Sequence, residues 1–366
     1  MIERIRPTSI RLDASTVCQL KCPLCPTAQG RVSHTLGDGF LSFSDYKKLV
    51  DENPRISCIE LSNWGEIFLN PNINDIIEYA YQKNIVLTAG NGVNLNTVKE
   101  KVLEGLVKYK FLFLNCSIDG ASQETYVAYR RGGNFAQVIE NIKIINFYKA
   151  KYRTLLPLLR WQFVPFGFNE HEIETARELA KKLKMIFYIK LSWNENYRPV
   201  TNKDLVRNAT ELRVASCSEY YKKYGKRYFL KEPCSQLWND PQINWDGRIL
   251  GCCVNYWGDF GNVFMSGLES GLNGEKIGYA RQMLLGKKEA RNGIPCTTCM
   301  SYTYMQENLC YMTKADIWNR STILKKTVCS LIHILGWKRM EVAPSVMNLV
   351  VRHLYGDKFA ESTRDK

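Results

Sequence analysis

Short apolar runs alternate with amphipathic segments through the first half of the chain. Apolar runs with the length and composition of strands buried on both faces lie near 8–14, 56–62, 85–89, 111–118, 160–165 and 186–192. Helical periodicity separates these runs and lies near 44–51, 73–83, 95–107, 134–150 and 169–183. Because strands joined by helical crossovers pair in parallel, the pattern predicts an α/β fold.

The expected architecture is a partial (β/α)6 barrel over residues 1–195, because six strands are too few for a closed eight-stranded barrel. Ligands of such sheets bind beyond the carboxyl ends of the strands, so candidate chemistry should follow each strand. Ser44 is the expected N-cap of the first helix, and Asn169 with Glu172 forms a capping-box-like start of the last one.

The pattern changes after residue 195. Residues 196–233 are polar, basic and tyrosine-rich, and we expect a connecting segment there. Residues 234–310 are rich in cysteine and glycine, which indicates a small domain of β-hairpins and helix that needs a metal to fold. Residues 311–366 are an expected helical extension with a polar tail, and their apolar stripes over 322–355 most simply cover a core, with membrane or partner docking as the alternative.

Composition places the chain among globular proteins, with 366 residues, 45% hydrophobic and 23% charged. The net charge of +14 is either a solvated basic surface or a complement to an anionic substrate, an acidic electron donor, an acidic lipid or a nucleic acid. No apolar run reaches about 18 residues, so we expect no membrane span. The N-terminus carries no apolar signal core, which predicts a cytoplasmic protein.

The chain has thirteen cysteines, and in a reducing compartment clustered thiols indicate metal rather than disulfides. Cys18, Cys22 and Cys25 have the spacing C-x3-C-x2-C directly after the first expected strand. Three thiolates on a short loop can hold three corners of an iron–sulfur cube and leave the fourth iron open. From spacing alone, a zinc site and a four-cysteine ferredoxin site are alternatives. Cys58 and Cys116 lie in apolar runs and are expected to be small core residues.

Residues 8–195 and 234–299 resemble the radical S-adenosylmethionine superfamily, chiefly through the three-cysteine spacing. The resemblance implies that Cys18, Cys22 and Cys25 bind a [4Fe–4S] cluster whose open iron takes S-adenosylmethionine. It also implies reductive cleavage of that cofactor to a 5′-deoxyadenosyl radical, with electrons from a flavodoxin- or ferredoxin-like donor. Leu24 replaces the aromatic residue usual before the third cysteine and leaves the ligands intact.

Three further motifs resemble the cofactor-binding positions of that superfamily. Gly65 and Glu66 follow the second expected strand and match its glycine–glutamate motif, which approaches the methionine amino group. Ser117 and Asp119 follow the fourth strand, where similar proteins contact the ribose or methionine moiety. Arg130, in YVAYRRGGNF, would pair with the cofactor carboxylate. Ordinary turns at these three places, without a ligand, are the alternative.

A second cysteine group comprises Cys234, Cys252, Cys296 and Cys299, with Cys253 and Cys310 as additional thiols. It resembles the auxiliary-cluster domains called SPASM and twitch. Because Met305 stands where the longer SPASM cysteine run would continue, the twitch form with one auxiliary [4Fe–4S] cluster fits better. The alternative is a structural zinc ribbon.

The resemblance implies an oxidoreductase or epimerase, and we expect a small polar substrate such as a carbohydrate or cyclitol, because no peptide-recognition segment precedes the first strand. Glu195 is a candidate substrate contact or base after the sixth strand, and Cys310 is a candidate hydrogen donor. A maturase acting on a peptide or protein is the first alternative. A zinc- or cluster-containing nucleic-acid-binding protein is the second, but no phosphate-binding stripe is recognisable, so we expect no nucleic-acid partner.

Overall fold

The computed structural model describes residues 4–337 and residue 339. Within this range the chain forms two compact units, each made from separate stretches of sequence. We call the first the terminal unit; it comprises residues 4–17, 31–88, 230–337 and 339. The second is the central unit and comprises residues 18–30 and 89–229. These units follow contacts between residues, and the domain boundaries at 195, 233 and 310 stay a prediction.

All six expected strands form, and two short strands follow them. The strands are β1 (Ser9–Leu12), β2 (Cys58–Glu60), β3 (Val86–Val93), β4 (Phe113–Ser117), β5 (Leu158–Phe163), β6 (Ile186–Ile189), β7 (Gln242–Ile243) and β8 (Ile249–Gly251). In the terminal unit the order is β3-β2-β1-β7-β8, with parallel pairs except β7 and β8, which are antiparallel. In the central unit β6, β5 and β4 pair in parallel, and the second half of β3 lies next to β4. The α/β parallel-strand prediction is therefore confirmed.

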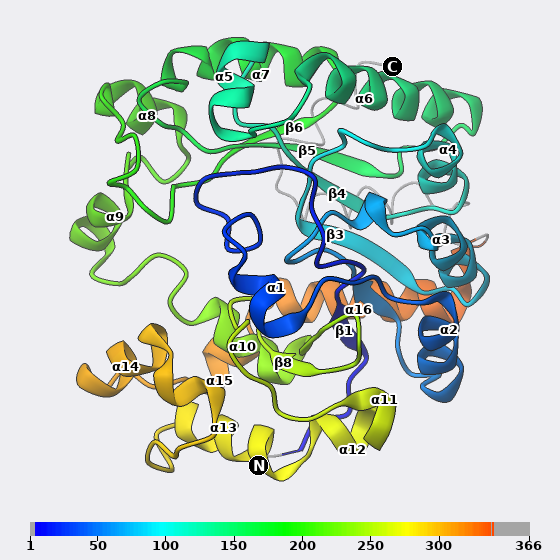
Figure 1. The fold of residues 1–366 in the computed structure, drawn as a ribbon, viewed down its shortest axis with the longest axis vertical. Coiled ribbons are helices and arrows are strands. Elements are labelled where there is room, and N and C mark those ends of the chain that lie inside the picture. The colour runs from blue at the N-terminus through cyan, green and yellow to red at the C-terminus, as the bar shows by residue number, and fades with distance from the viewer. Residues whose placement is uncertain (1–3, 338, 340–366) are drawn as a thin grey trace. The chain divides into compact units, whose positions relative to one another are not determined.

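Helices connect the strands in both units (Figure 1). The central unit contains α4 (Glu100–Lys108), α5 (Gln123–Tyr129), α6 (Phe135–Lys151), η2 (Glu170–Glu172), α7 (Ile173–Lys182), α8 (Lys203–Ala209) and α9 (Cys217–Tyr224). The terminal unit contains α1 (Arg31–Leu36), α2 (Phe43–Glu52), η1 (Ile67–Leu69), α3 (Ile73–Gln82), α10 (Glu232–Asn239), α11 (Val263–Ser266), α12 (Leu268–Leu272), α13 (Glu275–Leu284), η3 (Pro295–Thr298), α14 (Met300–Glu307), α15 (Lys314–Ile317) and α16 (Arg320–Leu335).

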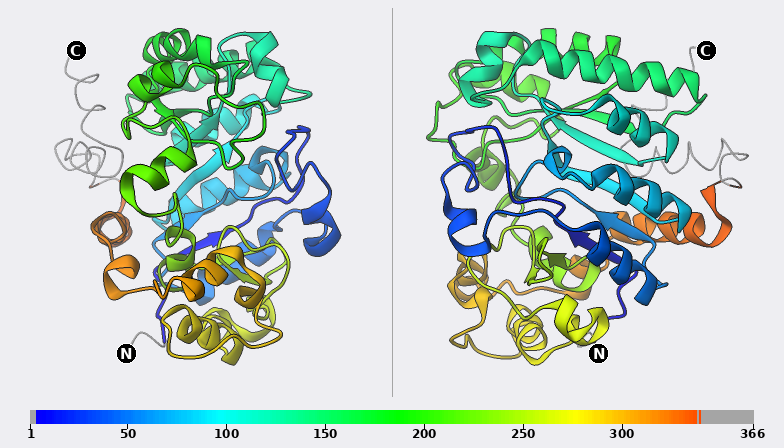
Figure 2. Two further views of the ribbon diagram at one scale, coloured as in Figure 1. Left: turned by 90° about the vertical axis from the view of Figure 1, so that its left-hand side faces the viewer. Right: turned by 45° about the vertical axis from the view of Figure 1, so that its right-hand side comes forward.

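The core of the central unit lies between its strands and helices. α7 packs against β6 and α4 packs against α6, and Figures 1 and 2 show α6 as a long helix beside the strands. Leu114 and Leu159, register partners on β4 and β5, are fully buried. Trp161 is also fully buried, and its indole N–H donates to Ile118 O at 2.9 Å. Each such side chain contributes roughly 1.5–3 kcal/mol by burial, which fixes the strand ends that carry the site.

Two helix starts differ from the sequence predictions. Ser42, not Ser44, caps α2: its hydroxyl accepts from Asp45 N at 3.0 Å. The capping box predicted at Asn169 and Glu172 is wrong, because neither side chain caps the helix that follows. Both side chains instead make hydrogen bonds to the loop after β4, Asn169 to the carbonyl of Asp119 and Glu172 to the N–H of Ala121.

The helix expected from residue 95 begins at Glu100. Leu95 has φ +55°, which a helix cannot contain, and the side chain of Asn94 accepts from Asn96 N at 2.9 Å in a tight turn. The local hydrogen bond therefore delays the helix by about one turn.

The predicted hairpin in the cysteine-rich region is confirmed as β7 and β8. Its turn contains Asp246 and Gly247, and Gly247 has φ +86°. A Cβ there would lie 2.5 Å from the Phe264 ring, so both conformation and space require glycine.

The apolar stripe expected over 322–355 falls partly on α16. Of the stripe residues on this helix, Ile332 is buried, whereas Ile323, Leu331 and Leu335 are 50%, 40% and 41% exposed, so only part of the stripe covers a core. The remaining stripe residues are Val346, Leu349, Val350 and Leu354, and they lie outside the described residues. No described helix combines the length and the hydropathy needed to span a bilayer.

Candidate functional site

The three-cysteine loop belongs to the central unit and is held by backbone hydrogen bonds. Cys25 N donates to Cys22 O at 3.1 Å, which closes a turn between these two thiols. Lys21 N donates to Arg131 O at 2.9 Å, so the loop is tied to the segment after α5. Cys22 is buried, and Cys18 and Cys25 are half-buried. The predicted ligands thus share one anchored loop.

A buried ion pair lies against this loop. The Nε and Nη2 atoms of Arg130 each lie 2.6 Å from Asp119 Oδ2, and Nη1 donates to Cys22 Sγ at 3.6 Å. Asp119 is fully buried, and its other oxygen accepts from Val164 N at 2.8 Å. Burial disfavours the charged guanidinium, but the carboxylate and the thiol more than offset this, and the pKa of Arg130 lies well above its usual value. Arg130 therefore stays charged beside Cys22.

This pair differs from the separate roles predicted for its members. Arg130 was expected to face the cofactor carboxylate and Asp119 another part of the cofactor, but the structure pairs them with each other. A guanidinium has five donors, and Asp119 and Cys22 engage three of its N–H-bearing atoms. Cofactor contact by either residue stays a prediction.

Asn169 and Glu172 hold the loop that carries Asp119. The side-chain amide of Asn169 donates to Asp119 O at 2.9 Å and to Val164 O at 3.0 Å. Glu172 accepts from Ala121 N at 2.6 Å and from the Thr125 hydroxyl. Sequence analysis missed these positioning roles. The available signal was that both polar residues follow the fifth strand, where an α/β sheet binds its ligands.

The neighbouring strand ends contribute Ser117 and Asn94. Ser117 ends β4 and is nearly buried, and a Cβ at Gly92 would lie 2.5 Å from its hydroxyl oxygen. Asn94 follows β3, donates to Cys18 Sγ at 3.8 Å, and accepts from Gln19 Nε2 at 3.0 Å. Asn94 is a contact of the cysteine loop that sequence analysis missed, although its place after a buried strand was a usable signal.

Gly65 and Glu66 belong to the terminal unit. A Cβ at Gly65 would lie 2.4 Å from Ser15 O, so the backbone approach there requires glycine. Glu66 is buried, its N–H donates to Val17 O at 2.8 Å, and its carboxylate accepts from Phe68 N at 3.3 Å. These contacts give Glu66 a structural role at η1, and the predicted cofactor contacts of both residues stay predictions.

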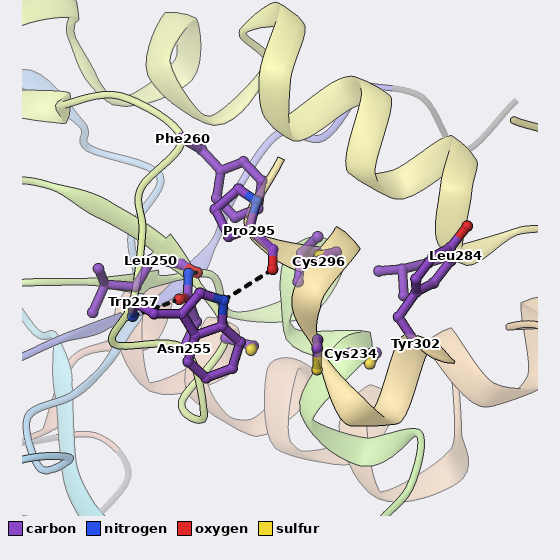
Figure 3. Close-up of a pocket in the computed structure, with 12 residues that line it drawn as sticks. Cys234, Leu250, Asn255, Trp257, Phe260, Leu284, Pro295, Cys296 and Tyr302 are labelled. Carbon is purple, nitrogen blue, oxygen red and sulfur yellow. Dashed lines mark hydrogen bonds between the residues drawn. The ribbon is translucent and has the colours of Figure 1, made fainter. Parts of the chain in front are cut away.

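The second predicted cysteine group lines one pocket of the terminal unit (Figure 3). Cys234 lies on α10, Cys252 follows β8, Cys296 lies on η3, and Cys299 caps α14. The four thiols line the same pocket, although among the described residues no three Cys, His, Asp or Glu side chains are grouped as the ligands of a single metal ion. They come from four elements, which only the folded chain brings together.

The pocket wall around these thiols is largely apolar. It includes Leu237, Phe260, Leu284 and Tyr302. The dashed line in Figure 3 from Trp257 Nε1 to Pro295 O is a hydrogen bond of 2.9 Å that closes one side.

Burial raises the pKa of three of the pocket thiols. It lies well above the usual value for Cys234 and Cys296 and at about 12 for Cys252. Four thiols, of which Cys234 is buried and the others are half-buried, line a pocket wall without a charged side chain. They fit the donor set of an iron–sulfur cluster, whose metal charge would stabilise the thiolates.

The other candidates lie outside the lining of this pocket. Cys253 exchanges hydrogen bonds with the side chain of Gln236, and Cys310 N donates to Met305 O at 3.0 Å.

Glu195 is half-buried in the central unit and accepts from Ser218 N at 3.1 Å and from the Ser218 hydroxyl, at the first turn of α9. Burial raises the pKa of Glu195, but these hydrogen bonds outweigh it and leave the pKa below its usual value. The catalytic roles of Glu195 and Cys310 stay predictions.

Comparison with protein families identifies the cysteine-rich region. Residues 234–300 match the SPASM family, described as an iron–sulfur cluster-binding domain. The match includes all four pocket cysteines and ends before Met305. The matched family is thus SPASM, whereas the sequence analysis preferred the twitch form because of Met305.

A curated relative and several solved structures are similar to the chain. The antilisterial bacteriocin subtilosin biosynthesis protein AlbA of Bacillus subtilis (strain 168) is 32% identical over 142 residues, which are 35% of this chain and 28% of the length of AlbA. Streptococcus suis SuiB bound to S-adenosylmethionine has a TM-score of 0.56 at 15% identity, covering 81% of this chain and 71% of SuiB. The anSMEcpe protein with bound AdoMet and Cp18Cys peptide has a TM-score of 0.54 at 13% identity, covering 94% and 99%. These similarities confirm the partial-barrel fold.

Proposed function

We propose that this chain is a radical S-adenosylmethionine enzyme with a C-terminal SPASM iron–sulfur domain, and that it modifies a peptide substrate by radical chemistry. The observation that supports this proposal is that three cysteines share one anchored loop, while four others line one pocket within the SPASM match. When bound, the cluster and S-adenosylmethionine supply a 5′-deoxyadenosyl radical that takes a hydrogen atom from the substrate.

The residues of the chain position and shield that chemistry. Cys18, Cys22 and Cys25 would hold the cluster that binds the cofactor, and Arg130 would balance the negative charge that the thiolates bring to the loop. The four pocket cysteines would hold auxiliary iron–sulfur chemistry among apolar side chains that exclude water.

The substrate class is inferred from the relatives. AlbA is named for the biosynthesis of a bacteriocin, and solved structures of SuiB and anSMEcpe contain a precursor peptide and a Cp18Cys peptide. These names favour a peptide over the small polar substrate expected from the sequence. That expectation depended on the lack of a recognisable leading segment, which is weaker support than a relative's substrate.

The test begins with anaerobically reconstituted protein, S-adenosylmethionine and dithionite. Cys18→Ala, Cys22→Ala and Cys25→Ala should each abolish formation of 5′-deoxyadenosine. Cys217→Ala, a half-buried thiol elsewhere in the central unit, is the matched control and should retain it. Full cleavage by any loop variant, or zinc in place of iron, would sink the assignment.

A second arm tests the substrate class. Synthetic peptides encoded by short reading frames beside the gene are incubated with the wild-type protein, and their masses are compared with the 5′-deoxyadenosine formed. A mass change in step with 5′-deoxyadenosine supports a peptide substrate. If a carbohydrate or cyclitol is converted to product and none of the peptides is, the small polar substrate expected from the sequence is supported instead.

A further inference from the structure

A groove of about 540 Å³ opens in the central unit beyond the ends of β5 and β6. Its volume lies within the range of specific ligand sites. Its walls are formed by Pro165 and Phe166, by Ser192 and residues 195–200, by α8 and by α9 with the residues before it. This is the edge of a parallel sheet at which substrates bind.

Aromatic contacts join the groove to the cysteine loop. Phe166 on the groove wall stacks on Tyr129 with ring centroids 4.8 Å apart, and Tyr197 meets Tyr129 at 6.2 Å. Tyr129 directly precedes Arg130, whose guanidinium donates to Cys22 Sγ at 3.6 Å. One series of side-chain contacts therefore runs from the groove wall through Tyr129 and Arg130 to the cysteine loop.

The carboxylates on the groove wall are already engaged. Glu219 accepts from Arg207 at 2.6 and 3.0 Å and from Ala215 N at 2.9 Å. Glu195 accepts from Ser218. Arg207 and Glu219 therefore cancel each other's charge. Glu195 keeps its negative charge, and the positive charge of Lys203 helps to lower the pKa of both Glu195 and Glu219.

Three cations of the groove wall remain without a carboxylate within ion-pair distance in the described part of the chain: Arg198, Lys203 and Lys222. All three are exposed. Arg198 is fixed in place, since its backbone has φ +46° and its carbonyl accepts from Gly167 N at 2.9 Å. A non-glycine residue in this region carries strain, which is common at binding sites.

We propose that this groove binds an acidic segment of the peptide substrate, with Lys203, Lys222 and Arg198 pairing with its carboxylates. The inference rests on the proposed function and specifies its substrate. Charge-assisted hydrogen bonds from lysine and arginine are the usual means of holding carboxylates. A single-stranded nucleic acid would need open rings in the groove for base stacking. The two aromatic rings that line the groove are Phe166, which is buried, and Tyr197, which is half-buried, whereas the exposed Trp193 lies outside the lining.

The experiment measures fluorescence anisotropy of a labelled peptide of alternating glutamate and glycine, titrated with the reconstituted full-length protein. The same peptide with glutamine in place of glutamate is the neutral probe. The wild-type protein should bind the acidic probe more tightly, and the difference should shrink as salt rises. Lys203→Glu/Lys222→Glu should weaken acidic-probe binding about tenfold or more, equivalent to about 1.4 kcal/mol per factor of ten.

The matched control is Lys181→Glu/Lys182→Glu, which changes net charge equally on the exposed face of α7. It should leave the affinity nearly unchanged, and Lys203→Gln/Lys222→Gln should give an intermediate loss. Equal losses in both charge-reversal variants, or equal binding of the two probes, would overturn the groove proposal. A uridine-rich RNA oligonucleotide that binds as tightly as the acidic peptide and responds to the same variants would replace the peptide by a nucleic acid.

Uncoupled 5′-deoxyadenosine formation is measured on the same samples. If the wild-type protein cleaves no cofactor, the proposed function fails whatever the anisotropy shows. If cleavage is normal in every variant while acidic-probe binding ignores Lys203 and Lys222, only the groove proposal fails.

Discussion

At the scale of single residues, the environment of Asp119 and Arg130 shows what spacing along the chain does and does not reveal. Cys18, Cys22 and Cys25 could be recognised because three ligands on one short loop leave a local pattern. Asn169 could not be recognised as a partner of Asp119, because its hydrogen bond crosses 50 positions. Likewise Cys58 and Cys329 gave no local signal, yet both are buried in the terminal unit, where their interaction lowers the pKa of Cys58 and raises that of Cys329.

Removal of Arg130 should affect both stability and cofactor binding. Arg130→Gln leaves the carboxylate of Asp119 buried without its cation, so the free energy of unfolding should fall by roughly 3–5 kcal/mol. Adding Asp119→Asn should recover part of that loss. In the reconstituted protein, loss of a charge-assisted contact should weaken S-adenosylmethionine binding about ten- to hundredfold.

Urea unfolding and equilibrium dialysis measure these two effects. Arg131→Gln is the control, because that neighbouring side chain is exposed. If both arginine variants behave alike, the Asp119–Arg130 pair has no special role. If stability falls while cofactor affinity does not change, Arg130 positions the loop and does not touch the cofactor.

Lys149 on α6 should make stability depend on pH. Burial, and then repulsion by Lys184, lowers its pKa from the ordinary 10.5 to about 7. Between these values the unfolded chain binds more protons than the folded one, so the free energy of unfolding should rise with pH, by at most about 1.4 kcal/mol per unit.

Lys149→Met should remove this rise and stabilise the protein near pH 7. Urea unfolding near pH 7 and pH 9 measures it, with Lys143→Met on the exposed side of the same helix as the control. A pH dependence that persists in Lys149→Met would show that Lys149 is hydrated in the folded protein.

At the scale of elements, the sequence predicted which segments form strands and helices better than where they begin. Hydrophobic periodicity extends over many residues and therefore survives in the fold. Element ends depend on single hydrogen bonds, as at Asn94, whose turn delays α4 to Glu100. Side chains that look like caps can also be recruited elsewhere, as Asn169 and Glu172 are by the loop after β4.

The start of α2 gives a direct test of this point. Ser42→Ala removes the hydroxyl that accepts from Asp45 N, and should lower the free energy of unfolding by about 1 kcal/mol. Ser44→Ala, the residue that the sequence favoured, should change it by less than about 0.5 kcal/mol. Urea unfolding of the two variants decides between them, and a larger loss for Ser44→Ala would contradict the observed cap.

At the scale of the whole molecule, the parallel pairing of the first six strands and the existence of a cysteine-rich region were predictable. The place of β7 beside β1, the kind of auxiliary domain and the substrate were not. Parallel pairing follows from helical crossovers, and this is a property of the chain order. The preference for twitch depended on the single residue Met305, which lies beyond the matched SPASM segment 234–300. A substrate is recognised by a surface assembled from distant segments, so the local sequence does not identify it.

The four pocket cysteines should affect both the stability of the terminal unit and the reaction. Replacing Cys234, Cys252, Cys296 and Cys299 together by alanine should remove about half of the bound iron if each site holds one [4Fe–4S] cluster. It should also destabilise the terminal unit, because metal-held regions lose folding free energy with their metal. The loop cysteines belong to the central unit, so uncoupled cleavage of S-adenosylmethionine should partly survive, whereas modification of the peptide should be lost.

Iron, zinc and sulfide are counted on the samples used for the cleavage assays, with Cys310→Ala as the control, since Cys310 lies outside the pocket lining. If iron is unchanged and zinc is lost, the pocket holds a structural zinc site and auxiliary redox chemistry has no support. If iron falls but the peptide is still modified at the normal rate, the auxiliary cluster only supports the fold. A redox-neutral reaction would then account for the product better than an oxidation, because no electron would need to leave the substrate through the pocket.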